Sequence, residues 1–129
     1  MSYDIQLADS VTRKVLYADM PHFIRGGTYC DGTQNDDGSF TSGDTRFALN
    51  ITYNYSQHLA HAFGDERGVR SIYGLTGAES IPLLKAAIAL LKDDVHEDYW
   101  EPTEGNTKRA LCGLLALAQM RPDGVWEGD

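Results

Sequence analysis

Two histidines on one side of a predicted helix are the first residues of this sequence that could bind a metal. His58 and His61 lie three positions apart, and Asp65 follows about one turn later. Such a pair can ligate zinc, but a structural zinc site needs four ligands and a catalytic site needs three and a water. His22 or His96 would have to complete the set from elsewhere in the fold. We favour the simpler interpretation, in which both histidines face solvent, and predict no metal site.

A polar and aromatic segment, residues 50–56, could bind a small ligand. It lies where a predicted strand leads into a helix, and the first turn of a helix offers unpaired amides that attract anions. Tyr53 or Tyr55 could stack on a planar ligand, with Asn50 and Asn54 beside them. The preceding predicted strand could add a cation and a closely approachable backbone. Its candidate ligand-binding residues are Arg25, Gly26, Gly27, Thr28 and Tyr29.

Structural alternatives compete with ligand binding at both junctions that precede helices. At the first, Asn50 or Thr52 caps the helix and two tyrosines enter the core, which is compatible with partial ligand binding. At the second, glycines in residues 71–79 resemble a phosphate-binding loop, but neither a P-loop nor a dinucleotide motif is present. A capping box between Thr76 and Glu79 explains this second junction.

A third cluster combines acidic and aromatic residues in the segment 93–104. This segment holds six acids and no lysine or arginine, with two aromatic residues between them. Aromatic anchors ringed by charge are typical of a protein-binding surface, and the negative potential would steer a basic partner. The candidate partner-binding residues are Asp94, Glu97, Asp98, Tyr99, Trp100 and Glu101. The alternative is a solvated connector whose aromatic side chains fill the gap between two helices.

No motif in the sequence identifies catalytic chemistry. There is no GxSxG elbow, no HExxH pair and no CxxC, and the acidic segment 31–44 lacks the glutamate that closes a calcium loop. Arg67 and Arg70 could serve an anionic ligand, but solvated surface arginines are the simpler interpretation. We therefore predict no catalytic residue and no cofactor.

The composition is that of one ordinary folded domain. The chain has 129 residues, of which 42% are hydrophobic and 23% charged, and a net charge of −8. From position 93 onward the sequence contains nine acidic and only three basic residues. This negative charge disfavours binding to the nucleic-acid backbone. The first residues do not resemble a secretion signal, and no apolar run could span a membrane. We expect a protein of the bacterial cytoplasm that binds neither membranes nor nucleic acids directly.

Hydrophobic periodicity predicts an α+β fold, with about four antiparallel strands followed by three amphipathic helices packed on one face. We expect a hairpin of residues 3–7 and 14–17, then strands at 23–30 and 45–51. The segment between the last two, residues 31–44, is predicted to be a flexible hairpin excursion.

The helices are predicted from their caps and apolar stripes. The first runs from about Tyr53 to Phe63 and ends at Gly64. The second begins at the capping box and buries Ile81, Leu84, Ile88 and Leu91. The third follows Thr103, buries Leu111, Leu114, Leu115 and Ala118, and ends before Pro122. Trp126 is expected to fold the tail back onto the core.

Several strings together resemble a group of small uncharacterised proteins of bacterial genomes and of phage or prophage regions. They are RGGTY at 25–29, NITYNYS at 50–56, IYG at 72–74, TGAES at 76–80 and RPDGVW at 121–126. The resemblance carries no activity and no site residue. What it implies is context, a small acidic accessory protein of a mobile element.

These observations lead to one functional hypothesis and two alternatives. We expect a non-catalytic, phage-type binding protein with a counter-defence role. It would sequester a small anionic, nucleotide-like signal or block a basic host defence protein. The alternatives are a small enzyme acting on a nucleotide-like or small polar substrate, and a structural or assembly accessory protein. A homo-oligomer is compatible with each of them.

Overall fold

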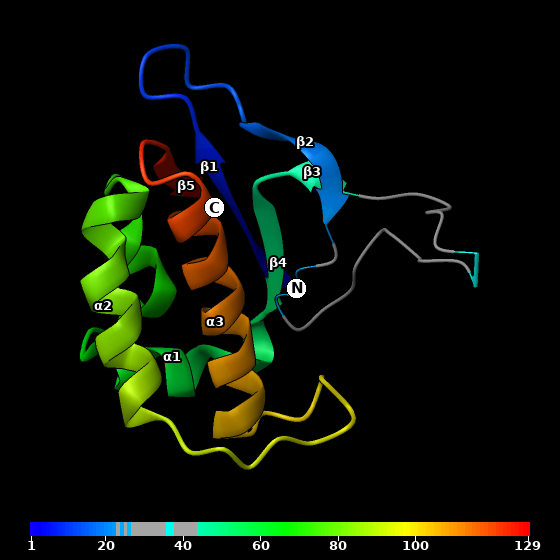
Figure 1. Ribbon diagram of the computed structural model, residues 1–129. Coiled ribbons are helices and arrows are strands. Elements are labelled where there is room, and N and C mark those ends of the chain that lie inside the picture. Colours follow the sequence, from blue (N-terminus) through cyan, green and yellow to red (C-terminus); the bar gives the residue numbers. More distant parts are fainter. Residues whose placement is uncertain (23, 25, 27–35, 38–43) are drawn as a thin grey trace.

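A computed structural model describes residues 1–22, 24, 26, 36–37 and 44–129 (Figure 1). The predicted strand 23–30 and the predicted excursion 31–44 lie outside the described residues, apart from single positions. The described part has the predicted α+β architecture, an antiparallel sheet with three α-helices.

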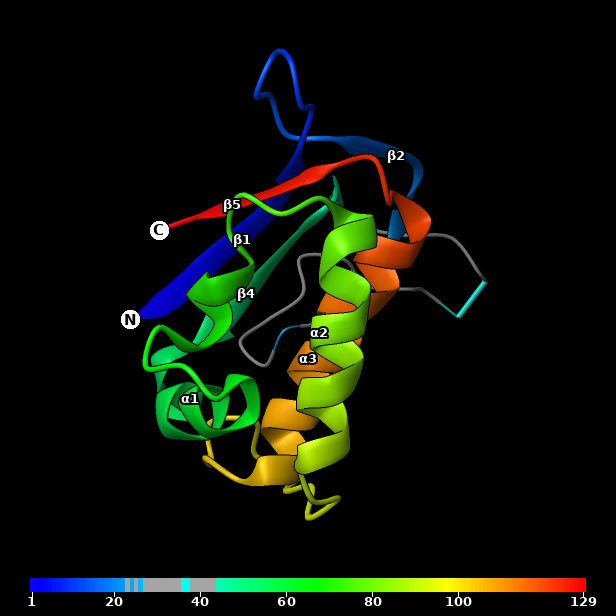
Figure 2. The same cartoon turned by 90° about the vertical axis from the view of Figure 1, so that its left-hand side faces the viewer.

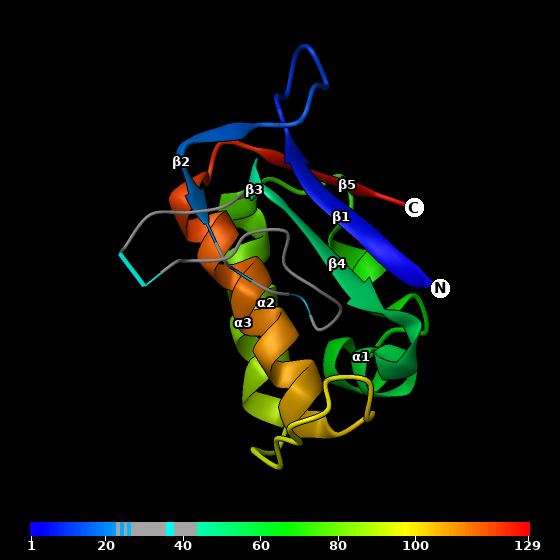
Figure 3. The ribbon, with the colours of Figure 1, turned by 90° about the vertical axis from the view of Figure 1, so that its right-hand side faces the viewer.

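The main sheet has three strands in the order β4-β1-β5. Strand β1 (Ser2–Ala8) is central, and both neighbours, β4 (Ala48–Thr52) and β5 (Val125–Gly128), are antiparallel to it (Figure 3). The side chains of β1 alternate, so that Tyr3 and Ile5 are buried on the face toward the helices. Burial of this face is what fixes the register.

A separate two-stranded sheet corrects the predicted hairpin. The turn is as predicted, because the Asp9 amide donates to the Lys14 carbonyl at 2.8 Å and residue 8 bridges to residue 15. After the turn, however, the chain leaves β1, and β2 (Tyr17–His22) pairs with β3 (Asp44–Arg46). The hairpin prediction was therefore wrong beyond residue 16, since a more distant segment supplies the partner strand.

The predicted strand 45–51 is divided at Phe47. The Phe47 side chain is buried, and its amide donates to the Leu16 carbonyl at 2.9 Å while its carbonyl accepts from the Leu7 amide at 2.8 Å. These bonds join the two sheets at one residue, and β3 and β4 separate there.

The helices follow the sequence signals closely. A 3-10 turn, η1 (Tyr53–Tyr55), leads into α1 (Ser56–Phe63), which ends at Gly64 with a φ of 62°, in the left-handed region. A second 3-10 turn, η2 (Gly68–Ile72), precedes α2 (Gly77–Leu90).

The caps of the two long helices confirm the predicted starts. The capping box of α2 is present, with both the Thr76 and the Glu79 bonds formed. Helix α3 (Glu104–Met120) is capped by Thr103, whose hydroxyl accepts from the Asn106 amide at 3.1 Å. The long helices lie side by side on one side of the main sheet (Figure 2).

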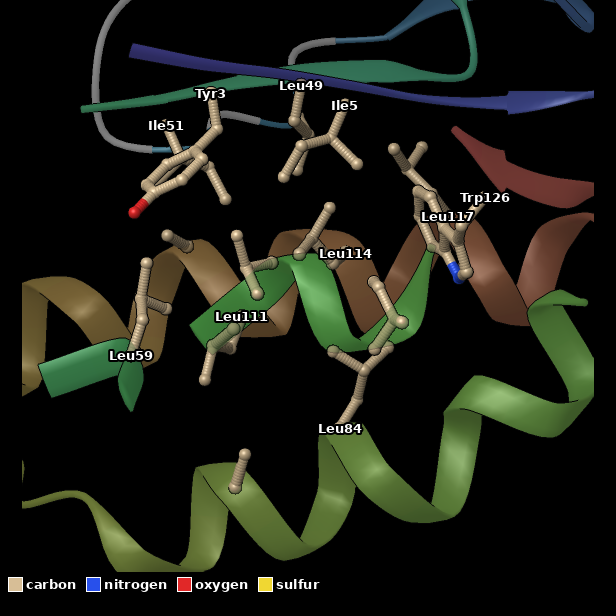
Figure 4. Close-up of a cluster of buried hydrophobic side chains, with 14 of the residues drawn as sticks. Tyr3, Ile5, Leu49, Ile51, Leu59, Leu84, Leu111, Leu114, Leu117 and Trp126 are labelled. Carbon is tan, nitrogen blue, oxygen red and sulfur yellow. The ribbon is translucent and has the colours of Figure 1, made fainter. Parts of the chain in front are cut away.

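The hydrophobic core lies between the main sheet and the helices (Figure 4). Strands contribute Tyr3, Ile5, Leu49, Ile51 and Trp126, and helices contribute Leu59, Leu84, Leu111, Leu114 and Leu117. Ile81, Ile88 and Leu115, which were predicted to be core residues, are only half-buried against this cluster. In the last turns of α3 the fully buried leucine is Leu117 and not Leu115.

Trp126 confirms the predicted return of the tail and adds a strand that was not predicted. Its side chain is buried, and its indole nitrogen donates to the Ser80 hydroxyl at 2.7 Å. The order of elements is therefore not strands followed by helices, because β5 comes after α3 and completes the sheet. Among the described residues, no helix is long and apolar enough to cross a bilayer.

Candidate functional site

Residues 91–103, here called the acidic loop, connect α2 to α3 and are held by one buried side chain. The Asn106 amide nitrogen donates to the carbonyls of Asp98 and Glu101, each at 3.0 Å, and its amide oxygen accepts from the His96 amide, also at 3.0 Å. Asn106 is 4% exposed. Three hydrogen bonds from a buried group fix the middle of the loop against the first turn of α3.

Acidic side chains of the loop bind the backbone of the first turn of α3 and of the loop itself. The Asp94 carboxylate accepts from the Gly105 amide at 2.9 Å, and the Asp98 carboxylate accepts from the Trp100 amide at 3.0 Å. Two predicted partner-binding acids therefore have a structural role. Glu97 and Glu101, by contrast, make no side-chain hydrogen bond or ion pair within the described part of the chain.

The strand-to-helix junction contacts the same loop. The side-chain amide nitrogen of Asn54 donates to the Trp100 carbonyl at 2.9 Å, and the Tyr55 hydroxyl donates to the Tyr99 carbonyl. The sequence had suggested two separate sites, one for a small ligand and one for a partner. The structure places Asn54 and Tyr55 of the predicted ligand site against residues 99–100 of the predicted partner site.

Tyr55 is a core residue as well as a contact of the loop. Its side chain is buried, and this burial raises the pKa of its hydroxyl to about 12. The hydroxyl therefore remains protonated and donates to the loop at neutral pH. Of the two residues predicted to cap the helix at this junction, Thr52 and not Asn50 does so. The Thr52 hydroxyl accepts from the backbone amide of Asn54 at 3.2 Å.

The first half of the predicted ligand site is described only in part. Arg25, Gly27, Thr28 and Tyr29 lie outside the described residues. Gly26 lies against β4, because a Cβ atom there would overlap the backbone of Asn50 and approach Ile51 Cγ1 at 2.8 Å. Asn50 itself donates to the Ser2 hydroxyl at 2.7 Å, and its buried amide oxygen has no partner in the described part of the structure.

Tyr53 and Arg70 form a cluster with Tyr3. The Arg70 guanidinium lies 4.8 Å from the centre of the Tyr3 ring and 5.8 Å from that of Tyr53, and it donates to the Asp129 carbonyl at 2.7 Å. The other unexplained arginine, Arg67, pairs with an adjacent aspartate at 2.8 Å. Neither arginine is thus left over for an anionic ligand.

The histidine pair is not arranged as a metal site. His58 Nε2 lies 2.7 Å from the Pro102 carbonyl, which attaches α1 to the end of the acidic loop, and His61 is exposed. Asp65 is the aspartate that pairs with the neighbouring arginine. Within the described residues, no three histidine, cysteine or acidic side chains are placed to share a metal ion.

A cavity of about 110 Å³ lies where the acidic loop meets η1 and α3. Its walls are formed by Tyr55, His96, Glu97, Tyr99, Asn106, Arg109 and Ala110. A second, shallower depression of about 450 Å³ lies across the junction, between η1, the start of α1 and Pro102. Three predicted site residues, Tyr55, Glu97 and Tyr99, thus face one hollow.

Asn106 and Arg109 are the site residues that sequence reasoning missed. Both fall within the predicted third helix, where they read as ordinary polar positions. The available signal was the position of Asn106, third after the capping Thr103, where a buried amide can reach a preceding loop. Arg109 follows three positions later and so lies on the same side of α3.

Comparisons with protein-family models, with curated proteins and with solved structures find no match to this chain.

Proposed function

We propose that this protein is a non-catalytic binding protein that presents its acidic loop to a basic surface of a partner protein. The observation that carries the proposal is the fixed conformation of a loop that is both acidic and aromatic. Asn106, Asn54, Tyr55 and His58 each hydrogen-bond to its backbone. A loop that is ordered before binding loses little conformational entropy when a partner docks.

The groups that remain available on the loop suit a cationic partner. Trp100 is 44% exposed and lies 4.9 Å from Tyr99, centre to centre, in a tilted ring pair. The unpaired carboxylates of Glu97 and Glu101 belong to the same loop. An exposed tryptophan can stack on an arginine of the partner, while the carboxylates pair with its neighbours.

The local charge favours a basic protein over a nucleotide-like anion at this position. An anionic ligand beside the loop would face several carboxylates, and the adjacent cavity of about 110 Å³ is smaller than an ordinary pocket for a drug-sized ligand, about 300 Å³ or more. The depression of about 450 Å³ across the junction is large enough, but no lysine or arginine is among the described residues that line it. The helix amides that could attract an anion at the junction are partly satisfied by Thr52. Sequestration of a nucleotide-like signal has less support here than partner binding.

The biological setting is part of the proposal. The resemblance to phage and prophage proteins is what supports a counter-defence role, in which the partner is a host defence protein that the acidic loop blocks. Enzymatic and assembly roles stay as alternatives, and the experiment below tests whether the loop binds a partner protein.

The test is capture of proteins from a bacterial extract by the immobilised protein and by variants of its loop. Trp100→Ala and Glu101→Lys should each abolish capture of the specific partner, because they remove the aromatic anchor and reverse an available charge. Glu66→Lys is the matched control, since Glu66 is an exposed acid outside the loop and the charge change is identical. Capture that survives both loop variants, or that is lost equally in the control, would refute the proposal.

A further inference from the structure

The cavity below the acidic loop has one acidic and one basic side chain in its walls. Glu97 belongs to the loop and Arg109 to α3, while Tyr55 and Tyr99 add aromatic surface to the same walls. Both charged residues are exposed, so a molecule in the cavity could reach them from solvent.

Neither charge is neutralised by the protein. Within the described residues, Glu97 and Arg109 form no ion pair and no side-chain hydrogen bond, either with each other or with another group. Several of the other polar wall groups already have partners. Asn106 makes three amide bonds to the loop, the Tyr55 hydroxyl donates to a carbonyl, and His96 Nδ1 accepts from the Asp98 amide. The acidic and the basic side chain are thus the charged groups that can select a ligand.

This pair of charges discriminates between ligand classes. Arg109 would attract a purely anionic ligand, but Glu97 would repel it. A purely cationic ligand would be attracted by Glu97 and repelled by Arg109. A molecule that carries both an ammonium and a carboxylate satisfies both groups at once. Electrostatic complementarity therefore favours a small zwitterion.

The size of the cavity limits the ligand further. An engineered protein cavity of about 150 Å³ accepts benzene, so a hollow of about 110 Å³ suits roughly five to eight non-hydrogen atoms. Glycine, alanine, serine and threonine as free amino acids fall in this range. Their side chains would lie against the tyrosine rings.

We propose that this cavity binds a small free α-amino acid, with its carboxylate on Arg109 and its ammonium group on Glu97. The site shares Glu97 with the loop surface that the proposed function uses, but its other charge, Arg109, lies on α3. The ligand class is new relative to that function. Because the cavity is closed on one side by the loop, an occupied site would also hold the loop in its present conformation.

The test is a titration of the isotope-labelled full chain, followed by NMR chemical shifts, with glycine, L-alanine, L-serine and L-threonine. At least one should bind with a Kd below about 10 mM and shift resonances of the cavity residues. Propionate and ethylamine each keep one charge of alanine, and each should bind at least about tenfold more weakly than the best amino acid. Arg109→Gln and Glu97→Gln should cause a similar loss, while Lys85→Gln on the exposed side of α2 should not.

Three results would overturn the inference. They are the absence of binding by all four amino acids, equal binding of propionate and alanine, and unchanged affinity in Arg109→Gln. Melting temperatures of the variants check that the fold is kept, which is expected because both charged residues are exposed. Failure here leaves partner capture untouched, since that experiment changes Trp100 and Glu101 and not the two charges of the cavity.

Discussion

Replacing Asn106 by alanine should release the acidic loop and lower the stability of the fold. The substitution removes the two bonds to loop carbonyls and the bond from the His96 amide, each 3.0 Å long in the native structure. At about 1 kcal/mol net for each bond, the loss is about 3 kcal/mol. Alanine recovers about 0.5 kcal/mol through its higher helix propensity, so the free energy of unfolding should fall by about 2–3 kcal/mol.

Urea denaturation measures this loss, and hydrogen exchange locates it. The His96 amide should lose protection in Asn106→Ala, while amides in the middle of α2 should keep theirs, because the released loop does not carry the core. Asn54→Ala is the control, since it removes a single bond from another asparagine to the same loop, at 2.9 Å. It should cost about 1 kcal/mol or less.

Asn106→Asp makes the test sharper because it nearly preserves shape. The new carboxylate would point acceptor oxygens at two carbonyls in an acidic loop, so it should destabilise the fold more than alanine does at neutral pH. The folded environment raises the pKa of such a carboxyl group. The electrostatic penalty should therefore shrink as the pH falls through the raised pKa toward about 4, the unfolded value, and should be absent below it. If neither substitution alters stability or His96 protection, the loop is not held by Asn106 and the argument for a preordered surface fails.

Three further perturbations test other parts of the structure. Ser80→Ala leaves the buried indole N–H of Trp126 without an acceptor and should cost about 1–3 kcal/mol in urea denaturation. Gly26→Ala should cost about 1–3 kcal/mol, because its methyl group would overlap the backbone of Asn50, and retained stability would contradict the close approach. The raised pKa of Tyr55, about 12 when folded against about 10 unfolded, contributes stability that is complete below pH 10 and is lost as the pH rises toward 12. Tyr55→Phe should make the decline of unfolding free energy over this range less steep.

Matched serine and tyrosine substitutions control for these effects. Ser71→Ala removes a hydroxyl that bonds only to a backbone carbonyl of its own turn, so it should cost less than Ser80→Ala. Tyr17 is 60% exposed, and Tyr17→Phe should leave the alkaline decline unchanged. An equal effect of the two tyrosine substitutions would mean that burial of Tyr55 does not govern the decline.

The helices could be predicted from the sequence because their signals are local. The Thr76 and Glu79 capping box, the Thr103 cap and the Gly64 terminus are each contained within a few residues, and each is present. The sheet was predicted less well, since strand partners are chosen by distant segments. No pattern within residues 45–51 indicates that Phe47 divides the strand by bonding to two other segments.

The candidate site shows the same division between local and distant information. Aromatic and acidic residues identified the loop and the junction, because their residue types are visible in the sequence. The contact between loop and junction depends on residues that are far apart in the sequence. Asn54 bonds to Trp100 across 46 positions, and Tyr55 bonds to Tyr99 across 44 positions. The local signal for Asn106 was its position three residues after the capping Thr103, but its importance comes from the loop that packs over it.

The central place of β1 in the sheet has a consequence for the order of folding. Its partners are far away in sequence, and the Asp4 amide bonds to the Asp129 carboxylate across 125 positions. Contacts of such separation form slowly, because a long loop must close before they contribute any stability. Helices α2 and α3 are neighbours in sequence and can pair early, whereas β1 gains its second neighbour only after β5 has been synthesised. Until then one edge of β1 has no partner strand, and an unpaired edge makes the nascent chain prone to aggregation.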